Sequence, residues 1–377
     1  MNPVYLDCNA TTPSEPRVLE LVRRYLEEEF GNEGSRTHEF GARAKQAVQK
    51  ARDQVAAVVG AKRDEVLFTS GATESNNLAI LGLAEHGLKT NKTHVITSAI
   101  EHKAVLEPFE VLEKRGFEVT ILPSNSSGRV DPKELEQALR PETLLVSLMH
   151  VNNETGIRQP MEEICAVLQD HDAYLHTDAA QGFGKDIEPL RNRRIDLISV
   201  SGHKIYAPKG VGALVVRRRG YSRVPLTPLV YGGGQERNLR PGTLPVALVA
   251  GLGLSSEIAV RERDERLRRN AEIRAAALEA LSPLNPEIAG SVEHASEHVL
   301  NLSFGDLDSE ALMVALKDLI AISNGSACTS SSYTPSHVLE AMGMSTDDAN
   351  RCVRLSWSHL TPDVDWKAVA ERLQGVV

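Results

Sequence analysis

Residues 144–178 read LLVSLMHVNNETGIRQPMEEICAVLQDHDAYLHTD, in which two short apolar runs flank a helical pattern. The runs LLVSLMHV and YLHTD have the length of buried strands, whereas MEEICAVLQ spaces its apolar residues as a helix does. A strand, a helix and a strand in this order predict parallel strands joined by a crossover helix. This stretch therefore predicts an α/β fold.

The same alternation extends in both directions, from about Pro16 to Val216. The further segments are VLELVRRYLEEEF, EVLFTS, a helix from Glu74, HVITS, a helix near residues 104–115 and FEVTIL. They predict a large domain, residues 15–258, in which a mostly parallel sheet carries helices on both faces. A sheet of this kind binds its ligand beyond the C-terminal ends of its strands.

A second unit follows the large domain. A helical pattern begins at about Pro245 and runs into the charged stretch RERDERLRRN, which we interpret as a solvated helix leaving that domain. Beyond it, VLNLSF and RCVRLS predict strands, whereas PSHVLEAMG and DSEALMVALKDL, with Asp308 as N-cap, predict helices. We place the domain boundary near residue 258 and predict a smaller α+β domain made of residues 1–14 and 259–377.

Length and charge restrict the classes of protein. A chain of 377 residues exceeds one ordinary core of about 150 residues, in agreement with two domains. The 42 basic and 51 acidic residues give a net charge of −9, which argues against a chain that coats nucleic acid or an anionic membrane. No stretch approaches about 18 uninterrupted apolar residues, and the N-terminus lacks the pattern of a targeting signal. We expect neither a membrane nor a direct nucleic-acid partner.

The four cysteines are irregularly spaced, at Cys8, Cys165, Cys328 and Cys352, which suggests neither a disulfide framework nor a metal site. A reducing cytoplasm fits this usage best. Cys165 lies on the apolar face of a predicted helix and Cys352 precedes a predicted buried strand, so we assign both to the core. We assign no catalytic role to Cys8.

Three separated segments carry the residue types of a cofactor site. Lys204 in ISVSGHKIYAPKGVGALVV lies among small and hydroxyl residues, where a desolvated amine can form a Schiff base, although a lysine in a loop is more often a surface residue. Asp178 ends the run YLHTD, where its carboxylate could hold a pyridine nitrogen protonated. In LFTSGATESNN, Ala72 and Thr73 begin a predicted helix suited to a phosphate, with a simple N-cap as the alternative.

The motifs SGATESNN, EHKAV, HVNNETG, HTDAAQ, SGHK, GGGQER, RPGT and GSACTS occur in the order and spacing of the NifS/IscS-like cysteine desulfurases. The chain resembles this class V aminotransferase family over nearly its whole length. The resemblance implies the fold type I of pyridoxal-phosphate transferases, with pyridoxal 5'-phosphate as cofactor, L-cysteine as substrate and a homodimer as the assembly.

The resemblance also implies a role for each matching position. Lys204 would bond covalently to the cofactor aldehyde, and His102 would stack on its ring. Asp178 would pair with the ring nitrogen, and Gln181 would bond the ring hydroxyl. The phosphate would be held by Ala72, Thr73, Ser201 and His203, with Thr243 of the partner subunit. The substrate carboxylate would be held by Asn153 and Arg354. The alternatives are a helix-start residue for His102 and a strand-end charge for Arg354.

Cys328 lies in AISNGSACTSSSYTPSH, a run of small and polar residues that predicts a mobile loop. A lone loop cysteine is usually a bystander, but an attacking thiolate that must reach a substrate and then an acceptor needs such a loop. The resemblance implies that Cys328 takes the sulfur of L-cysteine as a persulfide, leaves L-alanine, and passes the sulfur to an acceptor protein.

Several positions depart from the housekeeping members of the family, among them GNEGSRTH, RPGT and SWSH. The chain is more similar here to the DndA-like desulfurases of DNA phosphorothioation systems. The acceptor would then be a DNA phosphorothioation protein, with an iron-sulfur cluster scaffold as the alternative. Ser358 stands where a glycine is usual, which could narrow the carboxylate pocket.

Two other functions remain open. Another enzyme of the same fold, such as a class V aminotransferase or a selenocysteine lyase, would share the cofactor residues, and Cys328 argues against an aminotransferase because that reaction needs no thiol. The second open function is a non-enzymatic platform on which sulfur-transfer proteins assemble. The presence of a complete set of catalytic residue types argues against it, namely Lys204, His102, Asp178 and Cys328.

Overall fold

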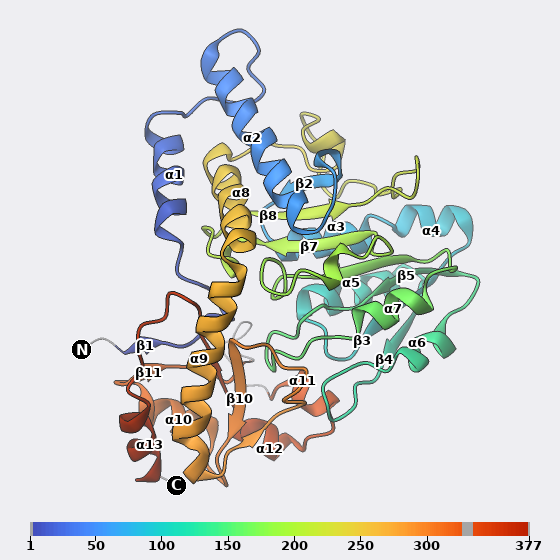
Figure 1. The fold of residues 1–377 in the computed structure, drawn as a ribbon. Helices are drawn as coiled ribbons and strands as arrows, with labels where there is room; N and C mark the ends of the chain where they lie inside the picture. Colours follow the sequence, from blue (N-terminus) through green and yellow to red (C-terminus); the bar gives the residue numbers. More distant parts are fainter. Residues whose placement is uncertain (1–2, 326–334, 376–377) are drawn as a thin grey trace.

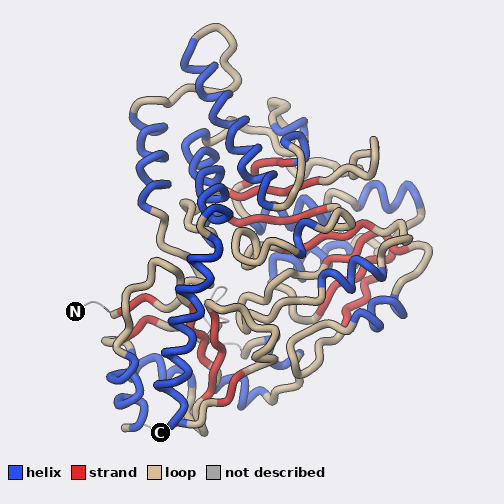
Figure 2. The backbone as a smooth tube through the Cα atoms, in the orientation of Figure 1, coloured by secondary structure: helices blue, strands red, loops and turns tan. Residues whose placement is uncertain are grey.

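The computed structural model describes residues 3–325 and 335–375 (Figure 1). A large sheet with helices on both sides forms one part of the molecule, and a smaller group of strands and helices next to the two termini forms the other (Figures 1 and 2). Cys328, the predicted sulfur acceptor, lies outside the described residues. The domain limits at residues 14 and 258 remain a prediction.

The large sheet has seven strands in the order β2-β8-β7-β6-β5-β3-β4. Strand β8 runs antiparallel to its two neighbours and the other pairs are parallel, so the predicted mostly parallel sheet is confirmed. Its strands are β2 (Val66–Thr69), β3 (His94–Ser98), β4 (Glu118–Leu122), β5 (Thr143–Ser147), β6 (Tyr174–Asp178), β7 (Leu197–Ser201) and β8 (Gly212–Val216).

The strands bury both faces because successive side chains alternate between two apolar clusters. In β8, Leu214 packs into one cluster, and Ala213 and Val215 pack into the other. The Leu214 side is covered by α3 (Ala72–Leu81), α4 (Ala84–Thr90) and α5 (Lys103–Lys114). The opposite side is covered by α2 (Glu39–Val58), α6 (Pro132–Ala138), α7 (Met161–Val167) and α8 (Val246–Arg261), and α1 (Pro16–Glu27) packs on α8.

The smaller part is built on a three-stranded antiparallel sheet, in which β10 (Val299–Ser303) lies between β9 (Glu287–Ile288) and β12 (Val353–Ser356). A short parallel pair, β1 (Val4–Tyr5) with β11 (Ile320–Ala321), brings the N-terminal segment to it. Its helices are α9 (Arg263–Leu281), α10 (Ser309–Leu316), α11 (His337–Ala341), α12 (Thr346–Arg351) and α13 (Trp366–Gln374). The predicted N-cap is confirmed, because the Asp308 side chain accepts a hydrogen bond from Glu310 N.

Helices α8 and α9 meet at Glu262 and connect the two parts (Figure 1). The charged stretch at the start of α9 is only partly solvated, so the prediction of a solvated helix is wrong for one face. Arg266 is 7% exposed, lies over the Tyr206 ring and pairs with Glu15 at 3.2 Å. Its burial follows from the position of α9, which packs this face against the chain next to Lys204.

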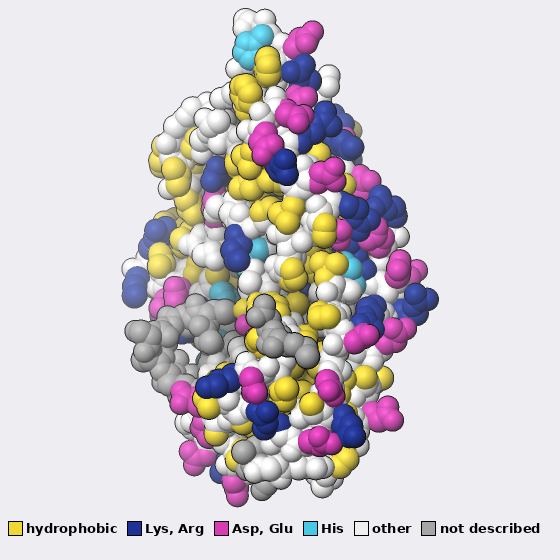
Figure 3. All heavy atoms as spheres, turned by 90° about the vertical axis from the view of Figure 1, so that its left-hand side faces the viewer, with side chains coloured by type: hydrophobic (Ala, Val, Ile, Leu, Met, Phe, Trp, Pro, Cys, Tyr) yellow, Lys and Arg dark blue, Asp and Glu magenta, His cyan; other side chains and the backbone are white. Residues whose placement is uncertain are grey.

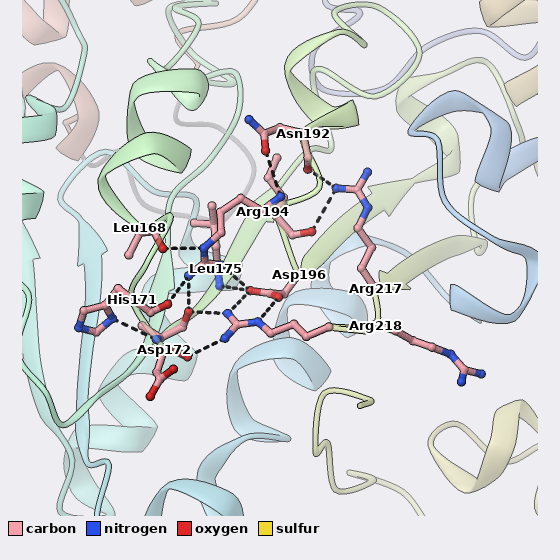
Figure 4. Close-up of polar contacts among 12 residues, drawn as sticks. Leu168, His171, Asp172, Leu175, Asn192, Arg194, Asp196, Arg217 and Arg218 are labelled. Carbon is pink, nitrogen blue, oxygen red and sulfur yellow. Dashed lines mark hydrogen bonds and ion pairs between the residues drawn. The ribbon is translucent and has the colours of Figure 1, made fainter. Parts of the chain in front are cut away.

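A buried carboxylate fixes the edge of the large sheet at which β6 and β7 begin. Asp196 accepts hydrogen bonds from Leu175 N at 2.7 Å and from Arg194 Nη1 at 2.9 Å (Figure 4). It also accepts one from Arg219 Nε at 2.7 Å. Arg217, which follows β8, donates to the backbone carbonyls of the neighbouring turns. These contacts hold the strands at one end, and the predicted site residues Asp178 and Ser201 lie at the other end of the same strands.

The surface on the α1 side carries basic and acidic side chains that are interspersed, together with scattered apolar ones (Figure 3). Among residues 3–325 and 335–375, no helix combines the length and the apolar character that a membrane span requires.

Candidate active site

A cavity of about 450 Å³ opens at the C-terminal ends of β6 and β7, next to the first residues of α3 and α5. It brings together ten predicted site residues from separate segments. These lining residues are Ala72, Thr73, His102, Asn153, Asp178, Gln181, Ser201, His203, Lys204 and Arg354. Since ligands bind beyond strand ends in sheets of this type, the cavity lies where the sequence predicts the site.

Two predicted residues lie elsewhere. Thr243 is exposed and does not line the cavity of its own chain, and its assignment to the partner subunit remains a prediction. Ser358 is buried and does not line the cavity either. Its hydroxyl accepts a hydrogen bond from Leu360 N at 3.2 Å instead, because the chain turns there after β12.

Lys204 ends the short turn that follows β7 and reaches back to the N-terminal segment. Its Nζ donates hydrogen bonds to the backbone carbonyl of Asn9 and, at 2.8 Å, to that of Ala10. Both residues also line the cavity. The amine is therefore held at the cavity by backbone oxygens, in a partly buried position that suits a lysine acting as nucleophile or base.

Asp178 is the last residue of β6 and is 7% exposed. Its Oδ2 accepts a hydrogen bond from Asn76 Nδ2 at 2.7 Å, and its Oδ1 accepts one from Ala180 N at 2.9 Å. The two donors come from α3 and from the turn after β6. They fix the orientation of a carboxylate that can hold a protonated ring nitrogen.

His102 begins a helix and also lines the cavity. The two interpretations of this position, a helix-start residue and a residue that contacts the cofactor, are therefore compatible. It is the N-cap of α5, and its Nδ1 accepts a hydrogen bond from Ala104 N at 3.0 Å. Burial lowers the pKa of His102, the nearby Asp178 opposes this shift, and Lys204 adds to it. The ring is therefore neutral at pH 7, and its proton lies on Nε2 because Nδ1 accepts.

Small residues let the chain pack tightly around the start of α3. A Cβ atom on Gly212 in β8 would lie 2.6 Å from Gly71 Cα, immediately before Ala72.

Ser201 and His203 reach the cavity from the end of β7. Burial lowers the pKa of His203 to about 4, and the charges of Lys204 and Lys209 add to this shift. A helix N-terminus, hydroxyl groups and a lysine in one place suit the binding of a phosphate.

Arg354 lies on β12 and is 2% exposed, so its guanidinium is a buried cation at the wall of the cavity. Its Nη1 donates to the backbone carbonyl of Asn153 at 3.0 Å. The strand-end alternative does not describe this position, since a solvated charge would not be buried. A guanidinium in such a wall suits a carboxylate ligand.

Four buried oxygens on lining residues have no hydrogen-bond partner within the described chain. They are Asn9 Oδ1, Asn76 Oδ1, Asn153 Oδ1 and Gln181 Oε1. Buried acceptors of this kind indicate that the site is completed by a ligand with hydrogen-bond donors. Together with the phosphate site, the carboxylate and the amine, they fit pyridoxal phosphate and an amino-acid substrate.

The sequence did not identify Asn9, Ala10, Asn76 or Lys209 as site residues, although all four line the cavity. Asn76 belongs to SGATESNN, so the motif contained a signal for it. Asn9 and Ala10 take part through backbone carbonyls, which every residue carries and no side-chain pattern reveals.

Comparisons with known proteins concern the chain as a whole. The family model for aminotransferase class-V matches residues 4–365. The cysteine desulfurase IscS of Anaeromyxobacter dehalogenans is 46% identical over 362 residues, which cover 93% of this chain and 87% of that protein. The crystal structure of DndA from Streptomyces lividans is 51% identical, with a TM-score of 0.83, over 93% of this chain and 98% of that chain. A structure of SspA in complex with cysteine is 39% identical, with a TM-score of 0.82, over 95% of this chain and 100% of that chain.

Proposed function

Because this chain belongs to the class-V aminotransferase family and, within it, to the cysteine desulfurases, we propose that it converts L-cysteine to L-alanine and holds the sulfur as a persulfide on Cys328. Enzymes of this family depend on pyridoxal phosphate. The observation that carries the proposal is the cavity in which Lys204, His102, Asp178 and Arg354 meet from four separate segments. An amine, a neutral imidazole, a carboxylate and a guanidinium in one cavity suit the chemistry of an amino acid.

The residues that would hold the cofactor follow from the cavity. Lys204 would bond to its aldehyde, Asp178 would face its ring nitrogen, and His102 and Gln181 would contact its ring. Ala72, Thr73, Ser201 and His203 would hold its phosphate, with Thr243 of the partner subunit in a homodimer. When bound, pyridoxal phosphate supplies an electron-withdrawing ring that stabilises negative charge released at the substrate Cα.

The chain's own residues then orient the substrate and move its protons. Arg354 and Asn153 would bind the carboxylate of L-cysteine at the wall that β12 contributes. Lys204 Nζ would remove the proton from Cα, since this residue lines the cavity and its amine is held there by the carbonyls of Asn9 and Ala10. His102 Nε2 carries a proton at neutral pH and can donate it to the reacting centre.

The sulfur step balances without an outside oxidant. The thiolate of Cys328 would attack the substrate Sγ, so that a bond between the two sulfurs forms while the bond between Cβ and Sγ breaks. Cβ keeps the electron pair of the broken bond and takes a proton, which yields L-alanine. The products are one alanine and one persulfide.

The other cysteines are poorly suited to this step. Burial raises the pKa of Cys8 to about 11, that of Cys352 to about 11 and that of Cys165 to about 12. These three side chains are therefore thiols at neutral pH, and the nucleophile must be a thiolate. Cys328 is the remaining cysteine of the sequence.

The acceptor that we propose is a protein of a DNA phosphorothioation system, and an iron-sulfur cluster scaffold is the alternative. Support comes from the motifs shared with the DndA-like branch and from the 51% identity to DndA of Streptomyces lividans. We propose a cytoplasmic location, which matches a thiol chemistry that needs reducing conditions.

The test uses the purified holoenzyme with L-cysteine and a thiol reductant, and measures L-alanine and sulfide together. We expect equal amounts of both from the wild type, and neither from Lys204→Ala, which also loses the visible absorbance of the bound cofactor. Alanine formation that requires a 2-oxo acid would favour an aminotransferase, and a strong preference for selenocysteine would favour a lyase. If the wild-type protein binds the cofactor but forms no product, the result would favour a non-enzymatic platform for sulfur-transfer proteins.

A further inference from the structure

Arg354 is held by a carboxylate that does not itself line the cavity. Its Nη2 lies 2.6 Å from Asp7 Oδ1 and 3.0 Å from Ser323 Oγ. The Ser323 hydroxyl donates to the same Asp7 oxygen at 3.0 Å. Asp7 follows β1 and forms a bridge with Ser356 of β12, so the N-terminal segment carries this carboxylate behind the guanidinium. The three side chains form one closed set of hydrogen bonds.

Within residues 3–325 and 335–375, the contacts of the Arg354 guanidinium leave one donor for a ligand. Its Nη2 is used by Asp7 and Ser323, and its Nη1 is used by the Asn153 carbonyl at 3.0 Å and the Gly325 carbonyl at 3.5 Å. Within the described chain, Nε has no partner. A carboxylate binds a guanidinium best through two parallel N–H groups. Bound substrate would therefore use Nε, together with a hydrogen of Nη1 or Nη2 that gives up one of these contacts.

The charges explain why Asp7 is needed. Arg354 is 2% exposed, and a buried cation without a counter-ion is costly and tends to move toward water. Asp7, whose side chain is 19% exposed and does not line the cavity, supplies the opposite charge. The guanidinium is therefore neutralised and fixed before the substrate arrives.

We propose that Asp7 is a positioning residue that acts through Arg354 and sets the affinity of the enzyme for the carboxylate of its substrate. This inference rests on the proposed function, because it takes L-cysteine as the molecule whose carboxylate meets Arg354. Asp7 contributes no proton to the reaction. Its loss weakens substrate binding and leaves the chemical step unchanged.

Two variants test this, Asp7→Ala, which removes the side chain, and Asp7→Asn, which keeps an oxygen for Arg354 Nη2 but removes the charge. The holoenzymes are titrated with L-cysteine and with cysteamine, which lacks the carboxylate, and binding is followed by the cofactor absorbance. For Asp7→Ala we expect the KM for L-cysteine to rise about tenfold or more and kcat to stay within about twofold. Cysteamine binding should not change. Asp7→Asn should show a smaller rise of the same kind.

Asp318→Ala is the matched control, because it removes a carboxylate that pairs with Arg372 at the exposed surface of the smaller part. It should leave both ligands unaffected. An unchanged or lowered KM in Asp7→Ala would overturn the proposal, as would an equal loss for cysteamine. If Asp7→Ala does not fold, the proposal is tested by Asp7→Asn, in which the ratio of L-cysteine affinity to cysteamine affinity should be lower than in the wild type. Wild-type enzyme without turnover would refute the proposed function, and the two binding titrations would still test the role of Asp7.

Discussion

Asn76 Nδ2 lies 2.7 Å from Asp178 Oδ2, and both side chains are buried. Asn76 belongs to α3, whose first residues form the proposed phosphate site, and Asp178 ends β6. This hydrogen bond therefore fixes the distance between the two groups that would hold opposite ends of the cofactor. The relative position of helix and strand is part of the active site.

Asp178→Asn keeps the shape of the side chain and removes its charge. We expect alanine formation to fall about 100-fold or more, because the ring nitrogen would lose the carboxylate that holds its proton. Single-turnover measurements of alanine on the holoenzyme test this. Asp186→Asn is the matched control, since Asp186 pairs with His150 outside the cavity. A rate in Asp178→Asn close to that of the wild type would contradict the assigned role.

Gly212→Ala should weaken cofactor binding. The added Cβ atom would collide with the Val200 carbonyl and lie 2.6 Å from Gly71 Cα, so the backbone at the start of α3 must shift. Overpacking of this kind costs about 1–3 kcal/mol, and we expect the Kd for pyridoxal phosphate to rise accordingly. Gly375→Ala, whose Cβ would meet its nearest atom at 3.5 Å, is the control. Equal affinity in both variants would show that the phosphate site tolerates the shift.

Because of Glu101, the free energy of unfolding should fall as the pH rises. Burial raises the pKa of Glu101 to about 8, although Met149 N and the Ser98 hydroxyl donate to its carboxyl group. The folded state then keeps a proton that the unfolded state releases near pH 4.3, so the free energy of unfolding falls between about pH 5 and pH 8, by up to about 1.4 kcal/mol per pH unit.

Glu101→Gln should flatten this dependence. Urea unfolding of the holoenzyme at several pH values measures the slope, and Glu113→Gln, which removes an exposed carboxyl of α5, is the control. A slope that is the same in Glu101→Gln and in the wild type would assign the pH dependence to other groups.

Asp196→Asn should destabilise the protein without altering the chemistry. The carboxylate is 2% exposed and binds the nearly buried Arg194 and the partly exposed Arg219, so its loss leaves the Arg194 guanidinium without a counter-ion, at a cost of about 3–5 kcal/mol. Asp53→Asn breaks an exposed pair with Arg63 and should cost about 1 kcal/mol or less. Denaturant midpoints compare the two. A loss in Asp196→Asn as small as that in Asp53→Asn would show that the network contributes little.

Much of the fold follows from the period of the apolar residues. The segment around β5, α7 and β6 predicts parallel strands, and parallel strands end at one edge, which is why Asp178 and Ser201 meet at the cavity. The direction of β8 was not predictable, because an antiparallel buried strand has the same apolar composition as a parallel one. The burial of Arg266 is not predictable either, because the sequence of a charged helix face carries no sign of what packs on it.

The site divides in the same way. Lys204 and Asp178 are predictable because the cofactor chemistry needs those residue types, whereas the role of His102 follows from the resemblance of its motif EHKAV to the cysteine desulfurases. Backbone carbonyls of Asn9 and Ala10 and the pair of Asp7 with Arg354 were not, since they arise when the N-terminal segment packs beside β12. Long-range contacts of this kind depend on the completed fold.

The central claim is that sulfur leaves L-cysteine on Cys328, and one measurement tests it most directly. Wild-type holoenzyme and Cys328→Ser are mixed with L-cysteine, and L-alanine is measured together with the mass of the peptide that contains residue 328. We predict that the wild type forms alanine and gains one sulfur atom on Cys328, whereas Cys328→Ser keeps the cofactor absorbance and forms neither alanine nor sulfide. Alanine and sulfide released by Cys328→Ser at the wild-type rate would contradict the account.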